Sequence, residues 1–271
     1  MTDRDLLASY VAVWWQAVAD LLALLDELGP DDWARPTDLP GWTVHDVVAH
    51  TAHLEAILAG APEETVDVTP GEHVRGLMGY YTEQGVVARR DRSPAELVAE
   101  IRETTARRHD QLLADMPADA SARPTVIFGG VPWDWRTLLR NRPLDVWMHE
   151  QDIRRAVGRP GNLDGEPAKH SADYLAESLP LVVAKRVGAP EATTVVLRIN
   201  GSKPLSVRVN ADGRGVRVPE IPATPTVRIN TDRETFVCLA GGRRAPAPGA
   251  VGLDGDQDLG QRILEAMAVT P

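Results

Sequence analysis

The sequence is poor in cysteine and in basic charge, and each shortage excludes a class of protein. Cys238 is the single cysteine among 271 residues, so an internal disulfide framework is excluded. Lysine and arginine number 29 against 39 aspartates and glutamates, which leaves a formal charge of −10. Phosphate backbones are bound through basic side chains. We therefore expect neither nucleic acid nor an anionic membrane as a partner.

Long apolar runs are also scarce. No stretch approaches the roughly 20 apolar residues that a membrane span needs, and the first residues, Met-Thr-Asp-Arg-Asp, have no apolar signal core. We therefore expect a cytoplasmic protein. Lysine occurs only at positions 169, 185 and 203, beside abundant arginine and alanine, a bias typical of a genome rich in G and C.

Histidine and tryptophan are unevenly placed along the chain. All seven tryptophans lie between Trp14 and Trp147, and all seven histidines lie between His45 and His170. Imidazole and indole groups are frequent components of binding and catalytic sites. We therefore expect the chemistry to reside in the first part of the chain.

Hydrophobic periodicity predicts a helical first part. Thr43, with Asp46 three residues later, has the pattern of a capping box. Pro143 either kinks its helix or splits it in two. The expected helices cover residues 4–28, 44–59, 70–90 with 94–116, and 134–157.

The pattern changes near residue 190. A helix over 167–187, broken at Pro180, precedes β-branched alternation separated by Asn-Gly and Asp-Gly turns. The expected strands cover 193–199, 205–209, 216–218 and 226–229, followed by helices over 231–240 and 258–267. The predicted fold is thus a helical bundle over 1–160 and a smaller α+β domain with a leading helix over 161–271, with a linker near 158–166.

Two helices carry inward-facing histidines. On the helix after Thr43, His50 shares a stripe with apolar residues, whereas His45 points toward solvent. On the helix over 134–157, Asp145 and His149 are one turn apart, with Asp152 on the same face. Considered alone, His50 is interpreted as a hydrogen-bonded core histidine. Asp145 and His149, considered alone, are interpreted as a surface pair.

Taken together, the two helices favour a metal centre. Two histidines, one carboxylate and an open fourth position recur in catalytic sites of first-row metals. Asp46 and Asp152 are candidates to orient the histidine rings from behind. The hypothesis requires the imidazoles of His50 and His149 to lie within about 8 Å of one another.

The two motifs resemble a known family. The segments Pro36-Thr-Asp-Leu-Pro-Gly-Trp-Thr-Val-His-Asp-Val-Val-Ala-His50 and Asp145-Val-Trp-Met-His149-Glu-Gln-Asp-Ile-Arg-Arg are similar to the mycothiol-dependent maleylpyruvate isomerases, which are DinB-like four-helix-bundle metalloproteins. The segment from Val227 to Arg243 resembles the family's α+β tail, which is itself similar to sterol-carrier folds. The resemblance covers nearly the whole chain.

The resemblance implies a divalent metal, usually zinc, on His50, Asp145 and His149. The family pattern has glutamate where this chain has Asp145, which is one methylene shorter. It also implies mycothiol, the small thiol of actinobacteria, as cosubstrate, in keeping with the arginine and alanine bias. A metal deprotonates a coordinating thiol. The implied reaction is transfer of that thiol to a small electrophile, or cis–trans isomerisation of the electrophile by addition and elimination.

The remaining candidates concern the substrate. Arginine binds carboxylates through two parallel hydrogen bonds, so Arg243, and after it Arg154, are candidates for a carboxylate-bearing substrate. Trp42 and Trp147 adjoin the ligand motifs and could line a cleft, although both also fit as core aromatics. Cys238 is expected to be a small core residue. No residue is assigned to the catalytic step itself.

Two other functions fit the same sequence. The α+β tail could bind an apolar ligand beside a purely structural bundle, or the metal could activate water in a DinB-like hydrolase. The substrate and the oligomeric state are not indicated by the sequence.

Overall fold

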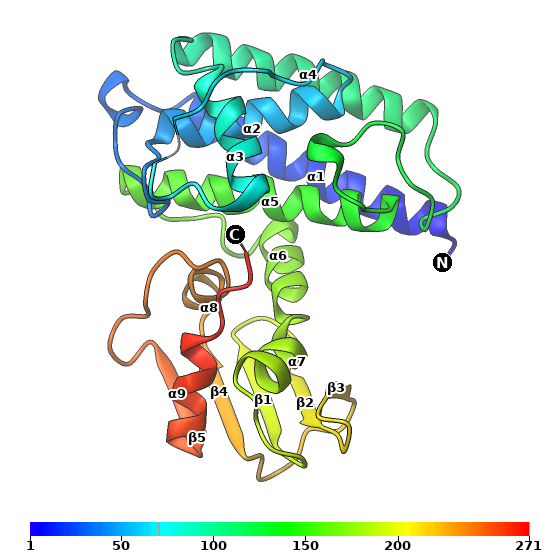
Figure 1. The fold of residues 1–271 in the computed structure, drawn as a ribbon, viewed down its shortest axis with the longest axis vertical. Coiled ribbons are helices and arrows are strands. Elements are labelled where there is room, and N and C mark those ends of the chain that lie inside the picture. The colour runs from blue at the N-terminus through cyan, green and yellow to red at the C-terminus, as the bar shows by residue number, and fades with distance from the viewer. Residues whose placement is uncertain (70, 271) are drawn as a thin grey trace. The chain divides into compact units, whose positions relative to one another are not determined.

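Five long helices make up the first half of the computed structural model, which describes residues 1–69 and 71–270. The chain divides into two units, Met1–Asn162 and Leu163–Pro271. The first unit contains α1 (Asp3–Leu25), α2 (Val44–Leu58), α3 (Gly76–Val87), α4 (Pro94–Ala114) and α5 (Trp135–Val157), with short 3₁₀ turns η1 (Pro30–Asp32) and η2 (Phe128–Gly130). The expected order, a helical domain followed by an α+β domain, is confirmed (Figure 1).

The helices begin where the sequence supplies caps. The Thr43 hydroxyl accepts a hydrogen bond from the backbone of Asp46, whose carboxylate reaches back to Thr43, so the expected capping box is present. Ser93 and Glu96 form the same motif at α4. The helices expected over 70–90 and 94–116 correspond to α3 and α4. Residue 70 itself lies outside the described residues. Pro143 stands inside α5, which continues through it as one helix.

The N-terminal helix α1 corrects one expectation. By length and composition it is apolar enough to cross a membrane, which the sequence analysis did not allow for. Its apolar face, however, is buried against α5 and α4, and Leu7, Trp14 and Leu21 are at most 1% exposed. Core helices of globular proteins satisfy the same length and composition test. The packing therefore accounts for the apolar character of α1.

A buried carboxylate joins the four longest helices. Glu55 of α2 has no exposed surface. Its Oε1 accepts hydrogen bonds from Trp14 Nε1 of α1 at 3.2 Å and from Arg142 Nε and Nη2 of α5 at 3.0 and 2.8 Å. Its Oε2 accepts from Arg108 Nη1 of α4 at 3.1 Å. Buried charges are tolerated when they are paired and hydrogen-bonded in this way.

The second unit contains a five-stranded sheet in the order β3-β2-β1-β4-β5. Only β1 and β4 pair in parallel; the other neighbours are antiparallel. The strands are β1 (Thr194–Ile199), β2 (Leu205–Val209), β3 (Gly215–Val218), β4 (Val227–Thr231) and β5 (Val251–Gly255). The helices are α6 (Glu166–Ala176), α7 (Leu179–Leu181), a π turn η3 (Val182–Arg186), α8 (Arg233–Ala240) and α9 (Gln257–Glu265).

Two features of this unit differ from the sequence prediction. The helix expected over 167–187 is interrupted after Ala176, ahead of Pro180, which lies in the first turn of α7. The edge strand β5 was not expected, because its sequence, Val-Gly-Leu-Asp-Gly, has two glycines and little β-branched character. Antiparallel pairing with the buried strand β4 holds β5 in place despite its weak intrinsic preference.

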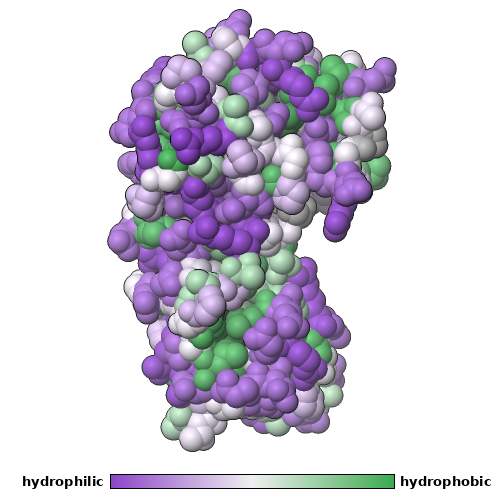
Figure 2. Space-filling view, turned by 90° about the vertical axis from the view of Figure 1, so that its left-hand side faces the viewer, coloured by the Kyte–Doolittle hydropathy of each residue, from purple (hydrophilic) through white to green (hydrophobic). Residues whose placement is uncertain are grey.

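The face of the molecule drawn in Figure 2 is mainly hydrophilic. Polar groups cover most of this face, and apolar groups gather in smaller areas. A face of this kind agrees with the formal charge of −10.

Glu55 gives the first testable prediction. Replacing it by glutamine keeps its shape but removes the counter-charge of buried Arg108 and leaves Arg142 with Asp145 alone, so we expect Glu55→Gln to lower the free energy of unfolding of the helical unit by about 3–5 kcal/mol. Urea unfolding followed by tryptophan fluorescence measures this, since all seven tryptophans lie in that unit.

The matched control for Glu55→Gln is Glu103→Gln on α4. The Glu103 side chain is 76% exposed and pairs with Arg107, so its loss should cost less than about 1 kcal/mol. Equal unfolding midpoints for the two variants would contradict the role given to Glu55.

Candidate metal centre

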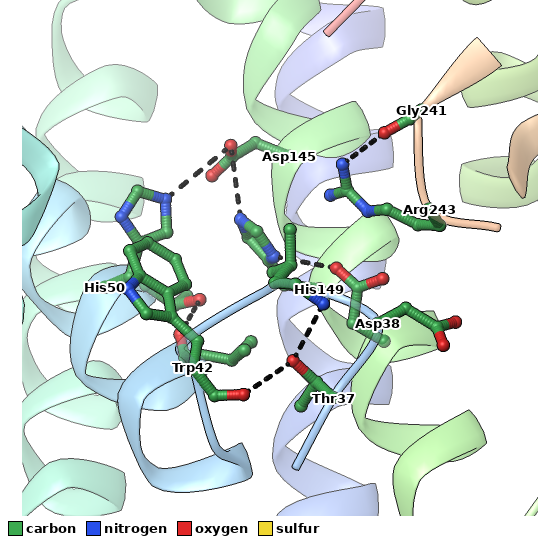
Figure 3. Close-up of polar contacts among 12 residues, drawn as sticks. Thr37, Asp38, Trp42, His50, Asp145, His149, Gly241 and Arg243 are labelled. Atoms are coloured by element: carbon green, nitrogen blue, oxygen red, sulfur yellow. Dashed lines mark hydrogen bonds and ion pairs between the residues drawn. The ribbon is translucent and has the colours of Figure 1, made fainter. Parts of the chain in front are cut away.

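Three side chains from two helices converge inside the helical unit. His50 extends from α2, while Asp145 and His149 extend from successive turns of α5 (Figure 3). His50 is 5% exposed and His149 is 6% exposed. Their ring centroids lie 4.9 Å apart with the planes at 80°. The proximity that the metal hypothesis requires is therefore present.

The donor atoms face one another without being hydrogen-bonded. Asp145 Oδ1 lies 4.0 Å from His50 Nε2 and 3.7 Å from His149 Nε2, both beyond the length of a hydrogen bond. One ligand atom from each residue lies within 4.8 Å of the other two. Donors around a zinc ion lie about 3–4 Å apart because each bond is about 2.0–2.2 Å long. The set fits a first-row cation after a small contraction.

Asp152 selects the tautomer that His149 would need as a metal ligand. His149 Nδ1 lies 3.2 Å from Asp152 Oδ2. In a neutral imidazole, a proton on Nδ1 donated to the carboxylate leaves the lone pair on Nε2, the nitrogen that lies 3.7 Å from Asp145 Oδ1. Arg155 Nη2 in turn donates to Asp152 Oδ1 at 2.5 Å. The structure thus places Asp152 where the sequence analysis expected it, behind His149.

His50 is held differently, and here an expectation is wrong. Asp46 was a candidate to orient His50, but its carboxylate is used by Thr43, accepting from the backbone N at 2.9 Å and from Oγ1 at 2.7 Å. The geometry of the capping box turns Asp46 toward the start of α2. His50 Nδ1 is buried and has no hydrogen-bond partner among the described residues. Burial is the main cause that lowers the pKa of His50, with a smaller contribution from His149.

Arg142 controls the charge of Asp145. Its Nη2 lies 2.9 Å from Asp145 Oδ2 in an ion pair, although the angles are not those of a hydrogen bond. Burial alone would raise the pKa of Asp145, but Arg142, and after it His149 and His50, hold that pKa well below its usual range. Asp145 is therefore ionised at neutral pH. Its side chain is 22% exposed, which makes it the most exposed member of the cluster.

A loop ahead of α2 supplies one wall. The ring centroid of Trp42 lies 5.1 Å from that of His50, and Trp42 Nε1 donates to Glu83 Oε2 at 2.9 Å. Gly41 has φ +83, and a Cβ there would lie 2.4 Å from the His73 ring, so only glycine fits the turn. Asp38 of this loop accepts from Arg155 Nε at 2.6 Å. The loop and α5 are thus joined, and Trp42 lines the site.

Two other candidates lie in the second half of α5. Trp147 is completely buried and donates through Nε1 to Asn162 O at 3.0 Å, so it is a core aromatic. Arg154 donates to Glu150 Oε1 at 2.7 Å and to Arg159 O at 3.4 Å. These contacts hold Arg154 at the C-terminal end of α5, and its assignment to a substrate carboxylate stays a prediction.

The remaining two candidates belong to the second unit. Cys238 on α8 is 4% exposed and is a core residue, as expected. Arg243 follows α8, and its Nη1 donates to Gly241 O at 2.6 Å and lies 3.3 Å from Thr270 Oγ1. Its assignment to a substrate carboxylate stays a prediction.

Sequence reasoning missed a third histidine of α2. His53 lies one turn after His50, has no exposed surface, and its Nδ1 is 3.4 Å from Arg89 Nη1. Gly85 leaves room for it, since a Cβ at that position would lie 2.2 Å from the His53 ring. Burial, then Arg89 and His50, lower the pKa of His53 to about 3. His45, expected to point to solvent, is bonded through Nε2 to Arg92 O at 2.8 Å.

The depressed pKa of His53 predicts acid sensitivity. Between pH about 6.5 and 3 the unfolded chain binds a proton at this position that the folded chain refuses, so stability falls as pH decreases through 6.5. For the metal-free protein, lowering the pH from 7.5 to 5.5 should decrease the free energy of unfolding of wild type by about 1.4 kcal/mol more than that of His53→Gln. Urea titrations at both pH values measure this.

His109→Gln is the control for the acid sensitivity of His53. The His109 ring is stacked on Trp15 outside the cluster. Parallel pH profiles for wild type and His53→Gln would show that His53 does not titrate in this way.

Comparison with known proteins supports the same family over both units. The family model for the mycothiol maleylpyruvate isomerase N-terminal domain matches residues 14–154, and that for the MDMPI C-terminal domain matches residues 169–262. Uncharacterized proteins from two strains of Mycobacterium tuberculosis are 29% identical over 140 residues, which are 51% of this chain and 52% of each relative. The chain thus spans about half the length of the curated relatives it matches.

Solved structures show the same fold. The crystal structure of the mycothiol-dependent maleylpyruvate isomerase is 19% identical, covers 94% of this chain and 95% of its own, and superposes with a TM-score of 0.55. A variant of that enzyme with a histidine replaced by alanine gives 0.53 at the same identity and coverage. Since the first family model alone covers more than half of the residues, the chain belongs to the mycothiol maleylpyruvate isomerase family.

Proposed function

We propose that this protein is a metal-dependent enzyme that uses a small thiol, mycothiol, to attack an electrophilic carbon of a small carboxylate-bearing substrate. The observation that carries the proposal is the convergence of His50, Asp145 and His149, whose donor atoms lie within 4.8 Å of one another without being hydrogen-bonded. The family membership supports the choice of thiol.

Each residue has a defined task in this proposal. His50, Asp145 and His149 would hold the cation, and zinc agrees with two imidazoles and one carboxylate. When bound, such a cation supplies a deprotonated, nucleophilic thiol at neutral pH. Asp152 keeps the His149 lone pair directed at the centre, and the Trp42 ring restricts access of water beside His50.

The protein's own thiol does not serve as the nucleophile. Cys238 is 4% exposed in the core of the second unit. The sulfur must therefore come from a cosubstrate. The thiolate forms a C–S bond while the electrophile's double bond becomes single and its electron pair moves onto the neighbouring carbon. In an S-transfer, that carbon takes up the proton that the thiol gave up, and the adduct is released. In a cis–trans isomerisation, rotation about the single bond is followed by C–S cleavage, which re-forms the double bond and returns the thiol.

Metal analysis tests the first part of the proposal. Protein purified or reconstituted with zinc should contain close to one metal ion per chain, and the double variant His50→Ala, His149→Ala should contain almost none, because two of three ligands are lost. Elemental analysis by mass spectrometry measures the ratio. His45→Ala is the control, since His45 lies on the same helix but bonds Arg92 O. Absence of metal from wild type would mean that the bundle is structural.

A thiol panel tests the second part. We expect turnover of maleylpyruvate, or conjugation of a panel of electrophiles, to require added mycothiol. The rate should fall by more than about 100-fold when the thiol is omitted, because the enzyme then positions the electrophile without its reaction partner. Chromatography of products separates an S-adduct from an isomer. Equal turnover without any thiol would favour metal-activated water, and hence a hydrolase.

A further inference from the structure

Arg142 joins the Glu55 network to the cluster of His50, Asp145 and His149. It is 1% exposed and lies on α5, one turn before Asp145. Its Nε and Nη2 donate to Glu55 Oε1 at 3.0 and 2.8 Å, while Nη2 also lies 2.9 Å from Asp145 Oδ2. Its Cζ stands 5.6 Å from the centroid of the Phe128 ring. Because the guanidinium is planar, two carboxylates and one ring fix its orientation.

The two oxygens of Asp145 therefore have different surroundings. Oδ2 faces Arg142 at 2.9 Å. Oδ1 faces both imidazoles, at 4.0 Å from His50 Nε2 and 3.7 Å from His149 Nε2. Rotation of the carboxylate out of this arrangement would break the ion pair with Arg142 and leave a buried guanidinium with less counter-charge, which is costly.

We propose that Arg142, anchored by Glu55, is a positioning residue that holds Asp145 as a ligand through a single oxygen, Oδ1. The inference rests on the proposed metal-dependent function. It assigns Arg142 a task beyond that of an ordinary core ion pair, because it decides which carboxylate oxygen faces the histidines.

The short side chain of Asp145 makes this positioning necessary. Asp145 has a short side chain with two rotatable bonds, so few of its rotamers reach the point between the two imidazoles. Its side chain is 22% exposed and has water as an alternative partner. The ion pair with Arg142 removes that alternative.

The same contact bears on which cations the centre accepts. Calcium and magnesium favour several carboxylate and water oxygens. One oxygen that shares its charge with a guanidinium, beside two imidazoles, suits metals that prefer nitrogen donors. We therefore expect Zn²⁺ and Co²⁺ to bind, and millimolar Mg²⁺ or Ca²⁺ not to compete with them.

Cobalt binding to the metal-free protein tests the proposal. Co²⁺ gives visible absorption bands whose intensity and position report on coordination geometry, so the readout is independent of activity. Arg142→Lys keeps the charge but cannot span Glu55 and Asp145, and Arg142→Met keeps the volume without the charge. Both should bind Co²⁺ about 10- to 100-fold more weakly, as found when groups that orient metal ligands are removed, and with altered bands.

Arg108→Lys is the matched control. Arg108 is 3% exposed and donates to the same Glu55, but from α4 and through Oε2. It should disturb the buried ion network without changing Co²⁺ affinity or spectrum. An equal loss of affinity in this control, or unchanged affinity and bands in a folded Arg142→Lys, would overturn the proposal. Tryptophan fluorescence during urea unfolding verifies that each variant is folded.

A double-mutant cycle provides the decisive comparison. In an Asp145→Ala background, Arg142→Lys should cause no further loss of Co²⁺ affinity if Arg142 acts only through Asp145. A full additional loss would show a merely structural effect and would overturn the proposal. If wild type itself binds no Co²⁺, the proposed metal-dependent function fails as well, so the two failures are distinguishable.

Discussion

The buried charge of Glu55 is the interaction on which the helical unit depends. A carboxylate with no exposed surface requires counter-charge and hydrogen-bond donors, and it receives them from the other three long helices, through Trp14, Arg108 and Arg142. The hydrogen bonds from these partners are directional. Keeping all of them restricts how α1, α4 and α5 rotate and slide against α2. The register of α2 against α5 then determines that His50 lies opposite Asp145 and His149.

Ion pairs support the site from two sides, and in each of them an arginine links a carboxylate of the site to a second carboxylate. On one side Arg142 connects Asp145 to Glu55; on the other Arg155 connects Asp152, behind His149, to Asp38 of the loop that carries Trp42. Asp145 and His149 thus each have a partner whose own position is fixed by the core, whereas His50 Nδ1 has no hydrogen-bond partner among the described residues. Such support limits the movement of the ligand atoms before any cation binds, which is the condition for a site of defined geometry.

The sequence was sufficient for what local rules determine and insufficient for what packing determines. Caps at Thr43 and Ser93, the helical period and the i, i+4 spacing of Asp145 and His149 are local signals, and they located the helices and the cluster. Asp46 has one carboxylate and two competing uses, and spacing alone could not show that the cap takes it. Glu55 and His53 were missed because α2 is buried on nearly all sides, so no polar face marked them. Arg142 lies three residues before Asp145, so helical spacing alone places the two side chains on the same face of α5.

The charge balance of the core gives the centre its preference among ligands. Glu55 and Asp145 are balanced by Arg108 and Arg142, so this buried set is neutral before a cation enters, and the two imidazoles add no negative charge. A divalent cation added to a neutral set leaves an excess of positive charge in a region of low dielectric. An anionic fourth ligand relieves that excess better than a neutral one does. In the proposed function, this charge balance would favour an ionised thiol over a neutral water molecule as the fourth ligand, and the preference would originate in Arg108 and Arg142.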